Sequence, residues 1–199
     1  NAFGQPALMR SGGGTLGLLH TGGCKALLEQ DLLPKVLSGS SAGAIMTGML
    51  GTSSADQIPE LLTGKHFFHE AFRFRKVMEL IKGHGGIADV MYLKKFLIHN
   101  MGDLTFAEAY QRSGLHINIA VAPYNASQNP LILNALTAPN ALVWSAVMAS
   151  CAVPVLFPPV HLTSKRYDGQ HTPYMSNTKW VDGSMRSDFP QEKMDRLYN

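Results

Sequence analysis

The stretch Lys35-Val36-Leu37-Ser38-Gly39-Ser40-Ser41-Ala42-Gly43-Ala44 decides the fold of this chain. Its apolar start predicts a short strand over residues 35–37, and the small side chains that follow predict a helix over residues 42–50. Between them, Gly39 to Gly43 match G-x-S-x-G, a motif whose serine lies on a sharp strand-to-helix turn with its hydroxyl exposed. Gly39 and Gly43 leave room for the chain to fold back on itself. We therefore predict a turn that presents Ser41 as a candidate nucleophile, although Gly/Ser-rich turns without chemistry share this composition.

A second unit of the same kind precedes this turn. The apolar residues 7–9 predict a strand, Ser11-Gly12-Gly13-Gly14 a glycine-rich turn, and residues 15–30 a helix. In that helix we expect five apolar residues to pack inward: Leu16, Leu19, Cys24, Leu27 and Leu28. Two strand–turn–helix units within about fifty residues are typical of parallel α/β packing.

The rest of the chain completes one domain over residues 1–199, without internal repeats or linkers. Residues 53–111 are mostly helical by spacing and are interrupted at residues 83–86. We predict strands over 117–121 and 131–133, and a helix over 141–153 that Asn140 caps and Pro154 ends. A last short strand at Trp180-Val181 carries Asp182-Gly183 at its end.

Composition excludes several classes of protein. The net charge is +3 and the basic residues are scattered, so we expect no nucleic-acid partner. Between Arg112 and Lys165 the chain has no charged residue, but prolines and asparagines interrupt this run. Buried strands and a helix therefore explain it better than a membrane span. Cys24 and Cys151 lie in apolar stretches, and we expect buried thiols.

A nucleophilic serine needs a proton acceptor. Asp182 is the strongest candidate because it ends a predicted strand and precedes a glycine. No histidine follows Asp182, so a triad in the order Ser, Asp, His cannot use it. Asp168 with His171 is the remaining alternative for a triad, in a polar stretch with no predicted strand.

The glycines Gly12, Gly13 and Gly14 admit two interpretations. Residues 12–17 match G-x-G-x-x-G, but a dinucleotide site needs an acidic residue near the end of the second strand, where this chain has Ser38-Gly39. An oxyanion hole formed by backbone N–H groups fits better, because residues without Cβ atoms allow a substrate carbonyl to approach closely. We expect no cofactor.

Residues 66–76 carry two further patterns. His66 and His69 have the i, i+3 spacing of two metal ligands, but no cysteine or paired acid completes a site, so we expect no metal. Phenylalanines alternate there with basic residues, which is compatible with docking on an anionic lipid surface or with packing in the core.

Together, these motifs resemble the patatin-like phospholipase family. The resemblance rests on the glycine-rich loop at Gly12–Gly14, G-x-S-x-G at Ser41 and Asp-Gly at Asp182, and it covers nearly the whole chain. Residues 102–106 with Glu108-Ala109-Tyr110 resemble a segment of the storage-lipid triacylglycerol lipase branch. Residues 149–154, followed by Phe157-Pro158-Pro159, are similar to the stretch that precedes the family's catalytic aspartate.

The resemblance implies a three-layer α/β/α sandwich with a mainly parallel central sheet, and a Ser–Asp dyad without metal or cofactor. Ser41 would be the nucleophile, Asp182 the proton acceptor, Gly12, Gly13 and Gly14 the oxyanion hole, and Gly39 and Gly43 the glycines of the nucleophile elbow. The expected activity is hydrolysis of glycerolipid esters, of triacylglycerol lipase, phospholipase A or lysophospholipase type. The alternative is a non-catalytic lipid-binding or scaffold protein on the same fold.

The resemblance also bears on partners and on the extent of the chain. We expect a lipid ester substrate and a soluble or peripherally associated protein that contacts a membrane or lipid-droplet surface. Many family members carry Arg or Lys where this chain has Leu16, which favours neutral glycerides. Members of the lipase branch continue with another strand soon after Asp-Gly, and this chain begins with Asn1, so we expect a fragment of a longer protein.

Overall fold

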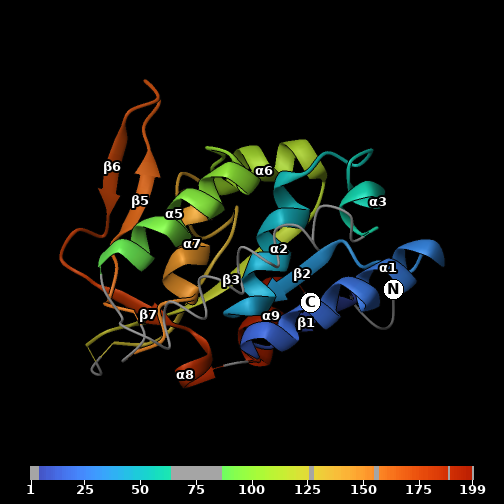
Figure 1. Cartoon of the computed structure of the whole chain (residues 1–199), viewed down its shortest axis with the longest axis horizontal. Coiled ribbons are helices and arrows are strands. Elements are labelled where there is room, and N and C mark those ends of the chain that lie inside the picture. The colour runs from blue at the N-terminus through green and yellow to red at the C-terminus, as the bar shows by residue number, and fades with distance from the viewer. Residues whose placement is uncertain (1–4, 64–86, 126–127, 155–156, 188, 199) are drawn as a thin grey trace.

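A computed structural model describes residues 5–63, 87–125, 128–154, 157–187 and 189–198 (Figure 1). The strands are β1 (Ala7–Arg10), β2 (Val36–Gly39), β3 (His116–Pro123), β4 (Leu131–Leu133), β5 (Leu162–Lys165), β6 (His171–Tyr174) and β7 (Trp180–Asp182). The helices are η1 (Gly14–Leu18, 3₁₀), α1 (Leu19–Glu29), α2 (Ala42–Thr52), α3 (Ile58–Leu61), α5 (Ile87–Met101), α6 (Phe106–Ser113), α7 (Val143–Ser150), α8 (Ser184–Ser187) and α9 (Gln191–Tyr198).

The central sheet confirms the predicted α/β class. β1, β2 and β3 run parallel in that order, while β4 and β7 each pair antiparallel with β3. The connection from β1 to β2 passes through η1 and α1, as parallel neighbours require a crossover. β5 and β6 form a separate two-stranded hairpin.

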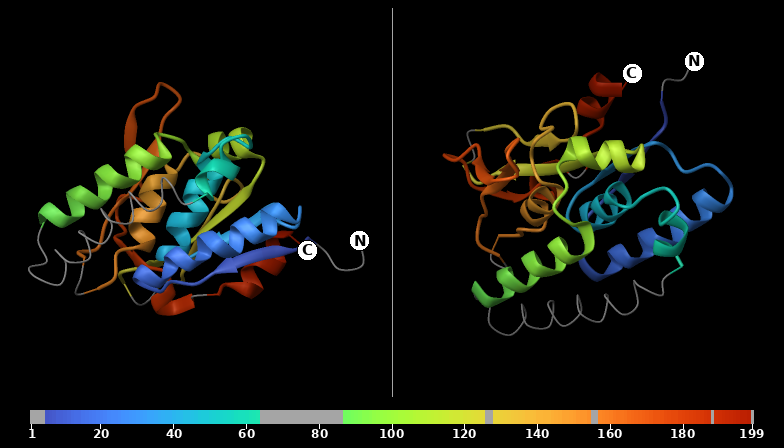
Figure 2. Two further views of the ribbon diagram at one scale, coloured as in Figure 1. Left: turned by 45° about the vertical axis from the view of Figure 1, so that its right-hand side comes forward. Right: turned by 90° about the horizontal axis from the view of Figure 1, so that it is seen from above.

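Helices cover both faces of the sheet and make three layers (Figure 2). Alternate residues of a strand point to opposite faces. Leu37 and its neighbours on one face join the large core under α2, α5 and α7. Val36 and Ile132 point to the other face, where Met194 of α9 packs on them.

The stretch without charged residues lies at the centre of the molecule. It contains β3, β4 and α7, whose side chains are almost all buried, as the sequence predicted. α7 starts later than predicted, because residues 141 and 142 first form bridges to residues 164 and 105. Leu142, not Asn140, is therefore the N-cap residue. None of the helices in the described ranges combines the length and apolar character needed to cross a bilayer.

The segment after the glycine turn differs from the prediction. It starts as a 3₁₀ helix, in which the side chains follow a tighter period than in the α-helix after it. Gly17 packs so closely on α2 that an added Cβ would lie 2.3 Å from the Cβ of Ala42. With Gly17 on the inner face, Leu16 and Leu19 are 68% and 74% exposed, so their predicted inward packing is wrong, whereas Cys24 is buried as predicted.

Candidate active site

The turn between β2 and α2 has the strained geometry that the sequence motif predicted. Ser41 has φ 49° and ψ −119°, a left-handed backbone conformation that costs a residue with a side chain about 1–3 kcal/mol. A Cβ on Gly39 would lie 2.3 Å from the carbonyl oxygen of Gly43, and one on Gly43 would lie 2.4 Å from that of Arg10. Both positions therefore require glycine, and the turn leaves Ser41 partly exposed.

Strand pairing brings Asp182 to the end of β2. Ile119 of β3 pairs with Gly39 on one side and with β4 on the other. Two residues further along, Val121 pairs with β4 and with Asp182. Because β4 occupies one side throughout, β2 and β7 must share the other side of β3. They run in opposite directions, and their carboxyl ends meet head-on beside Ala120.

A buried serine connects the two strand ends. The backbone N–H of Ser41 donates to Ser150 Oγ at 3.0 Å, and Ser150 Oγ donates to the carbonyl oxygen of Ala120 at 2.7 Å. That same oxygen would lie 2.3 Å from a Cβ on Gly183, so the backbone beyond Asp182 touches it. Ser150 is completely buried at the end of α7. It therefore fixes the backbone of Ser41 relative to the strand that carries Asp182.

Cys151 lies beside both candidate catalytic residues. Its thiol donates to the carbonyl oxygen of Ser41 at 3.5 Å. Burial, and after it the nearby charge of Asp182, raise the pKa of this thiol far above its usual range. Asp182 is itself fully buried, and its Oδ1 accepts a hydrogen bond of 2.8 Å from the backbone N–H of Ser184. The backbone N–H of Asp182 donates to Ala152 at 3.0 Å, which attaches β7 to the segment after α7.

The glycine-rich loop lies against Ser41. A Cβ on Gly12 would be 3.2 Å from the Cβ of Ser41 and 3.8 Å from that of Ser184. Gly13 and Gly14 have φ values of 142° and 56°, which side-chain-bearing residues rarely adopt. The loop therefore places backbone of Gly12 next to the candidate nucleophile, with η1 starting at Gly14.

A buried arginine that the sequence reasoning missed lies behind this site. Arg10 is 4% exposed, and its guanidinium donates to Cys24 Sγ at 2.9 Å and to Thr47 Oγ1 at 3.0 Å. Burial lowers the pKa of Arg10, while its interactions with Cys24 act in the opposite direction. The backbone oxygen of Arg10 also accepts the N–H of Ser40 at 3.2 Å. Arg10 thus ties β1 to α1, to α2 and to the turn. The only sequence signal was a charged residue at the end of an apolar strand.

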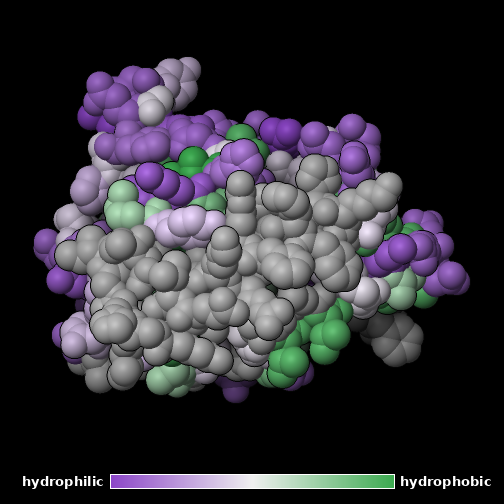
Figure 3. Space-filling model, viewed as in Figure 1, coloured by the Kyte–Doolittle hydropathy of each residue, from purple (hydrophilic) through white to green (hydrophobic). Residues whose placement is uncertain are grey.

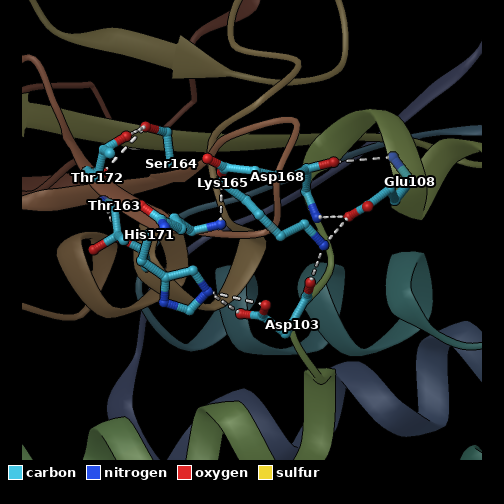
Figure 4. Close-up of polar contacts among 11 residues, drawn as sticks. Asp103, Glu108, Thr163, Ser164, Lys165, Asp168, His171 and Thr172 are labelled. Atoms are coloured by element: carbon cyan, nitrogen blue, oxygen red, sulfur yellow. Dashed lines mark hydrogen bonds and ion pairs between the residues drawn. The ribbon is translucent and has the colours of Figure 1, made fainter.

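The alternative triad does not form. His171 lies at the start of β6, which the sequence pattern did not predict, and its Nε2 is 2.9 Å from the carboxylate of Asp103 (Figure 4). Asp168 accepts instead from the backbone N–H of Gln170 at 3.1 Å, in the turn that joins β5 to β6. Next to this pair, Lys165 contacts Glu108 at 2.7 Å. These contacts attach the β5–β6 hairpin to the segment after α5 and to the first turn of α6.

The remaining predicted sites fall outside the described ranges. His66, His69 and the aromatic and basic residues of 66–76 are not among the described residues. Within those that are described, no group of three His, Cys, Asp or Glu side chains has the arrangement of a metal site.

Comparisons with known proteins place the chain in a family. The sequence profile of the family described as Patatin-like phospholipase matches residues 8–195. Triacylglycerol lipase 4 of Saccharomyces cerevisiae is 42% identical over 213 residues, which cover 99% of this chain and 23% of the relative. Triacylglycerol lipase 5 of the same yeast is 38% identical, with 99% and 29% covered.

A solved structure has the same fold. VipD from Legionella pneumophila superposes with a TM-score of 0.55 at 16% sequence identity, over 94% of this chain and 47% of that one. The chain spans less than a third of the length of the two yeast relatives. Because the profile covers residues 8–195 and the yeast relative is 42% identical across nearly the whole chain, the chain belongs to the patatin-like phospholipase family.

Proposed function

We propose that this domain hydrolyses carboxylic esters of glycerolipids through a Ser41–Asp182 dyad. The observation that carries the proposal is the head-on meeting of β2 and β7 beside Ala120, with Ser150 and Cys151 in contact with the backbone of Ser41. A turn that serves only packing needs neither a strained serine nor a fully buried carboxylate at the facing strand end.

The chemistry follows from these positions. Asp182 accepts the Ser41 proton as the Oγ attacks the ester carbonyl carbon, and the resulting oxyanion is stabilised by backbone N–H groups of the Gly12–Gly14 loop. Asp182 returns the proton to the departing alcohol, which leaves an acyl group on Ser41. Water, deprotonated by Asp182, then attacks the acyl-enzyme, and the bond to Ser41 Oγ breaks as Asp182 returns the proton to that oxygen and the fatty acid leaves.

Neutral glycerides are the proposed substrate class. The yeast relatives are named triacylglycerol lipases, and the loop beside Ser41 carries Leu16 in place of a cation. Triacylglycerols are insoluble in water, so the domain would work as a peripheral protein at a lipid surface.

The test compares five proteins on p-nitrophenyl butyrate and emulsified triolein: the parent, Ser41→Ala, Asp182→Asn, and two matched controls. Asp168→Asn alters the other Asp-Gly pair, and Ser40→Ala alters the neighbouring serine. Asn at residue 182 can still accept the N–H of Ser184, so the fold should survive. We expect Ser41→Ala and Asp182→Asn to lose at least about a thousandfold in kcat, and both controls to stay within about threefold of the parent.

Labelling with a fluorophosphonate separates the possible failures. A reactive Ser41 should be modified in the parent and not in Ser41→Ala. Full activity of Asp182→Asn would refute the dyad. A folded parent that binds lipid but neither reacts with the probe nor hydrolyses either ester would instead support the scaffold alternative.

A further inference from the structure

Four large apolar side chains are exposed on the segments that follow the glycine loop and Asp182. Leu16 is 68% exposed, Leu19 74%, Met185 59% and Phe189 55%. We call these four residues the apolar rim. Single exposed apolar residues are common on soluble proteins, so the significance of the rim depends on whether its members lie together and on what they surround.

The rim comes from two chain segments that meet at the glycine loop. A Cβ on Gly12 would lie 3.8 Å from the Cβ of Ser184, the residue before Met185, and 3.2 Å from that of Ser41. A Cβ on Gly13 would lie 3.7 Å from the Cβ of Leu16. The start of α1 and α8 lie side by side in two views (Figures 1 and 2). Leu16 from one segment, and Ser184 next to Met185 from the other, therefore border the loop that touches Ser41.

The packing of η1 explains why these leucines face outward. Gly17 is buried against Ala42, so the opposite side of the same short helix must carry Leu16 to the surface. Hydrophobic atoms are visible over α1, and paler ones at α8, along the lower edge of the face in Figure 3. The rim is thus a consequence of the same close contact that sets the glycine loop beside the nucleophile.

The charge pattern specifies the kind of surface that would cover the rim. No Asp, Glu, Lys or Arg occurs from Ser11 to Cys24. Proteins that bind anionic bilayers use clusters of basic residues, and this segment offers none. An uncharged apolar surface is complementary to an uncharged lipid surface, where burial of apolar area supplies the attraction.

We propose that the apolar rim inserts into the surface of a neutral lipid phase, a phosphatidylcholine monolayer over triacylglycerol, and thereby brings Ser41 to the substrate. The partner follows from the proposed function, because the ester is dissolved in that phase. Binding should depend on the leucines and be insensitive to salt, since residues 11–24 carry no charge and Arg186 and Asp188, between Met185 and Phe189, have opposite charges.

The binding test does not require catalysis. Triolein droplets coated with dioleoylphosphatidylcholine are floated with Ser41→Ala protein in about 50 and about 500 mM NaCl, where electrostatic interactions are weakly and strongly screened. Two rim variants are made in the Ser41→Ala protein: Leu16→Ser combined with Leu19→Ser, and Phe189→Ser alone. The control is Leu32→Ser, because Leu32 is 66% exposed but lies beyond the far end of α1. We expect partitioning to fall by about tenfold for each leucine removed, equally at both salt concentrations, and to stay unchanged in the control.

Three results would overturn the proposal. The first is unchanged flotation of both rim variants, and the second is an equal loss of flotation in Leu32→Ser. The third is binding that needs anionic lipid or is clearly lost at the higher salt concentration, about 500 mM NaCl, where charges are strongly screened. Circular dichroism confirms that each variant is folded. In the active protein, the rim variants should lose more activity on emulsified triolein than on p-nitrophenyl butyrate. Loss of the hydrolysis proposal would leave the flotation result intact, so the two proposals fail independently.

Discussion

Replacing Ser150 with alanine should lower both the stability of the protein and its kcat. Ser150 Oγ accepts the N–H of Ser41 at 3.0 Å and donates to the carbonyl oxygen of Ala120 at 2.7 Å. Both bonds are lost in Ser150→Ala, and a buried polar group left without a partner costs about 1–3 kcal/mol. The free energy of unfolding should therefore fall by about 2–5 kcal/mol, because partial relaxation offsets some of the summed cost.

The effect on rate follows from the bond to Ser41 alone. Ser41 holds a backbone conformation that costs about 1–3 kcal/mol, and without its acceptor the turn can relax towards ordinary geometry. If about 1.4–2.8 kcal/mol of transition-state positioning is lost, kcat falls about 10- to 100-fold. KM should change little, because Ser150 is completely buried and does not reach the substrate.

Ser145→Ala is the matched control. Ser145 lies on the same helix, is 2% exposed, and accepts the backbone N–H of Thr163 at 2.7 Å. Urea denaturation and p-nitrophenyl butyrate kinetics are measured for both variants, at a temperature where each is folded. Ser145→Ala should lose stability but retain kcat. Wild-type kcat in Ser150→Ala, or an equal loss of kcat in Ser145→Ala, would refute the positioning argument.

Two further predictions concern the glycines and the thiols. Gly43→Ala places a Cβ 2.4 Å from the backbone oxygen of Arg10 and should cost about 1–3 kcal/mol or more in urea denaturation, whereas Gly22→Ala in α1, where nothing lies within 4 Å, should stabilise by about 0.5–1 kcal/mol. Burial raises the pKa of Cys24 and of Cys151 above that of an unfolded thiol, about 8.5, so the folded state holds more protons at alkaline pH and the free energy of unfolding should fall as pH rises above that value. Iodoacetamide at about pH 9 should leave both thiols intact in native protein and alkylate both in urea; rapid alkylation of native Cys151 would contradict its burial against Ser41.

The sequence predicted the parts of the site that depend on local patterns. The strand, glycine turn and helix around Ser41 each depend on the pattern of neighbouring residues in the sequence, and so does the strand that ends at Asp182. Ser150 could not be found in this way, because a serine in an apolar helix has no local signature and both of its partners are distant in sequence. Arg10 escaped for a similar reason, since its buried partners lie on two other helices.

Two elements escaped prediction for different reasons. The β5–β6 hairpin is short, polar and mostly half-buried, so it lacks the alternation of apolar residues that identifies a strand. Ion pairs to Asp103 and Glu108 connect it to the rest of the domain, and ion pairs between residues distant in sequence produce no periodic sequence pattern. In η1, the change from 3₁₀ to α geometry altered the phase of the side chains, and Leu16 and Leu19 were therefore predicted on the wrong face.

The head-on meeting of β2 and β7 also sets the time at which the site can form during synthesis. Gly39 and Asp182 occupy the same side of β3, but β3 itself begins only at His116, and β7 ends at Asp182. A nascent chain that has reached α7 already contains the turn, the glycine loop and Ser150, yet the side of β3 beyond Gly39 stays open. The ribosome must deliver Trp180–Asp182 before the proposed nucleophile meets its proposed base, so a shorter nascent chain holds Ser41 in its turn without a proton acceptor.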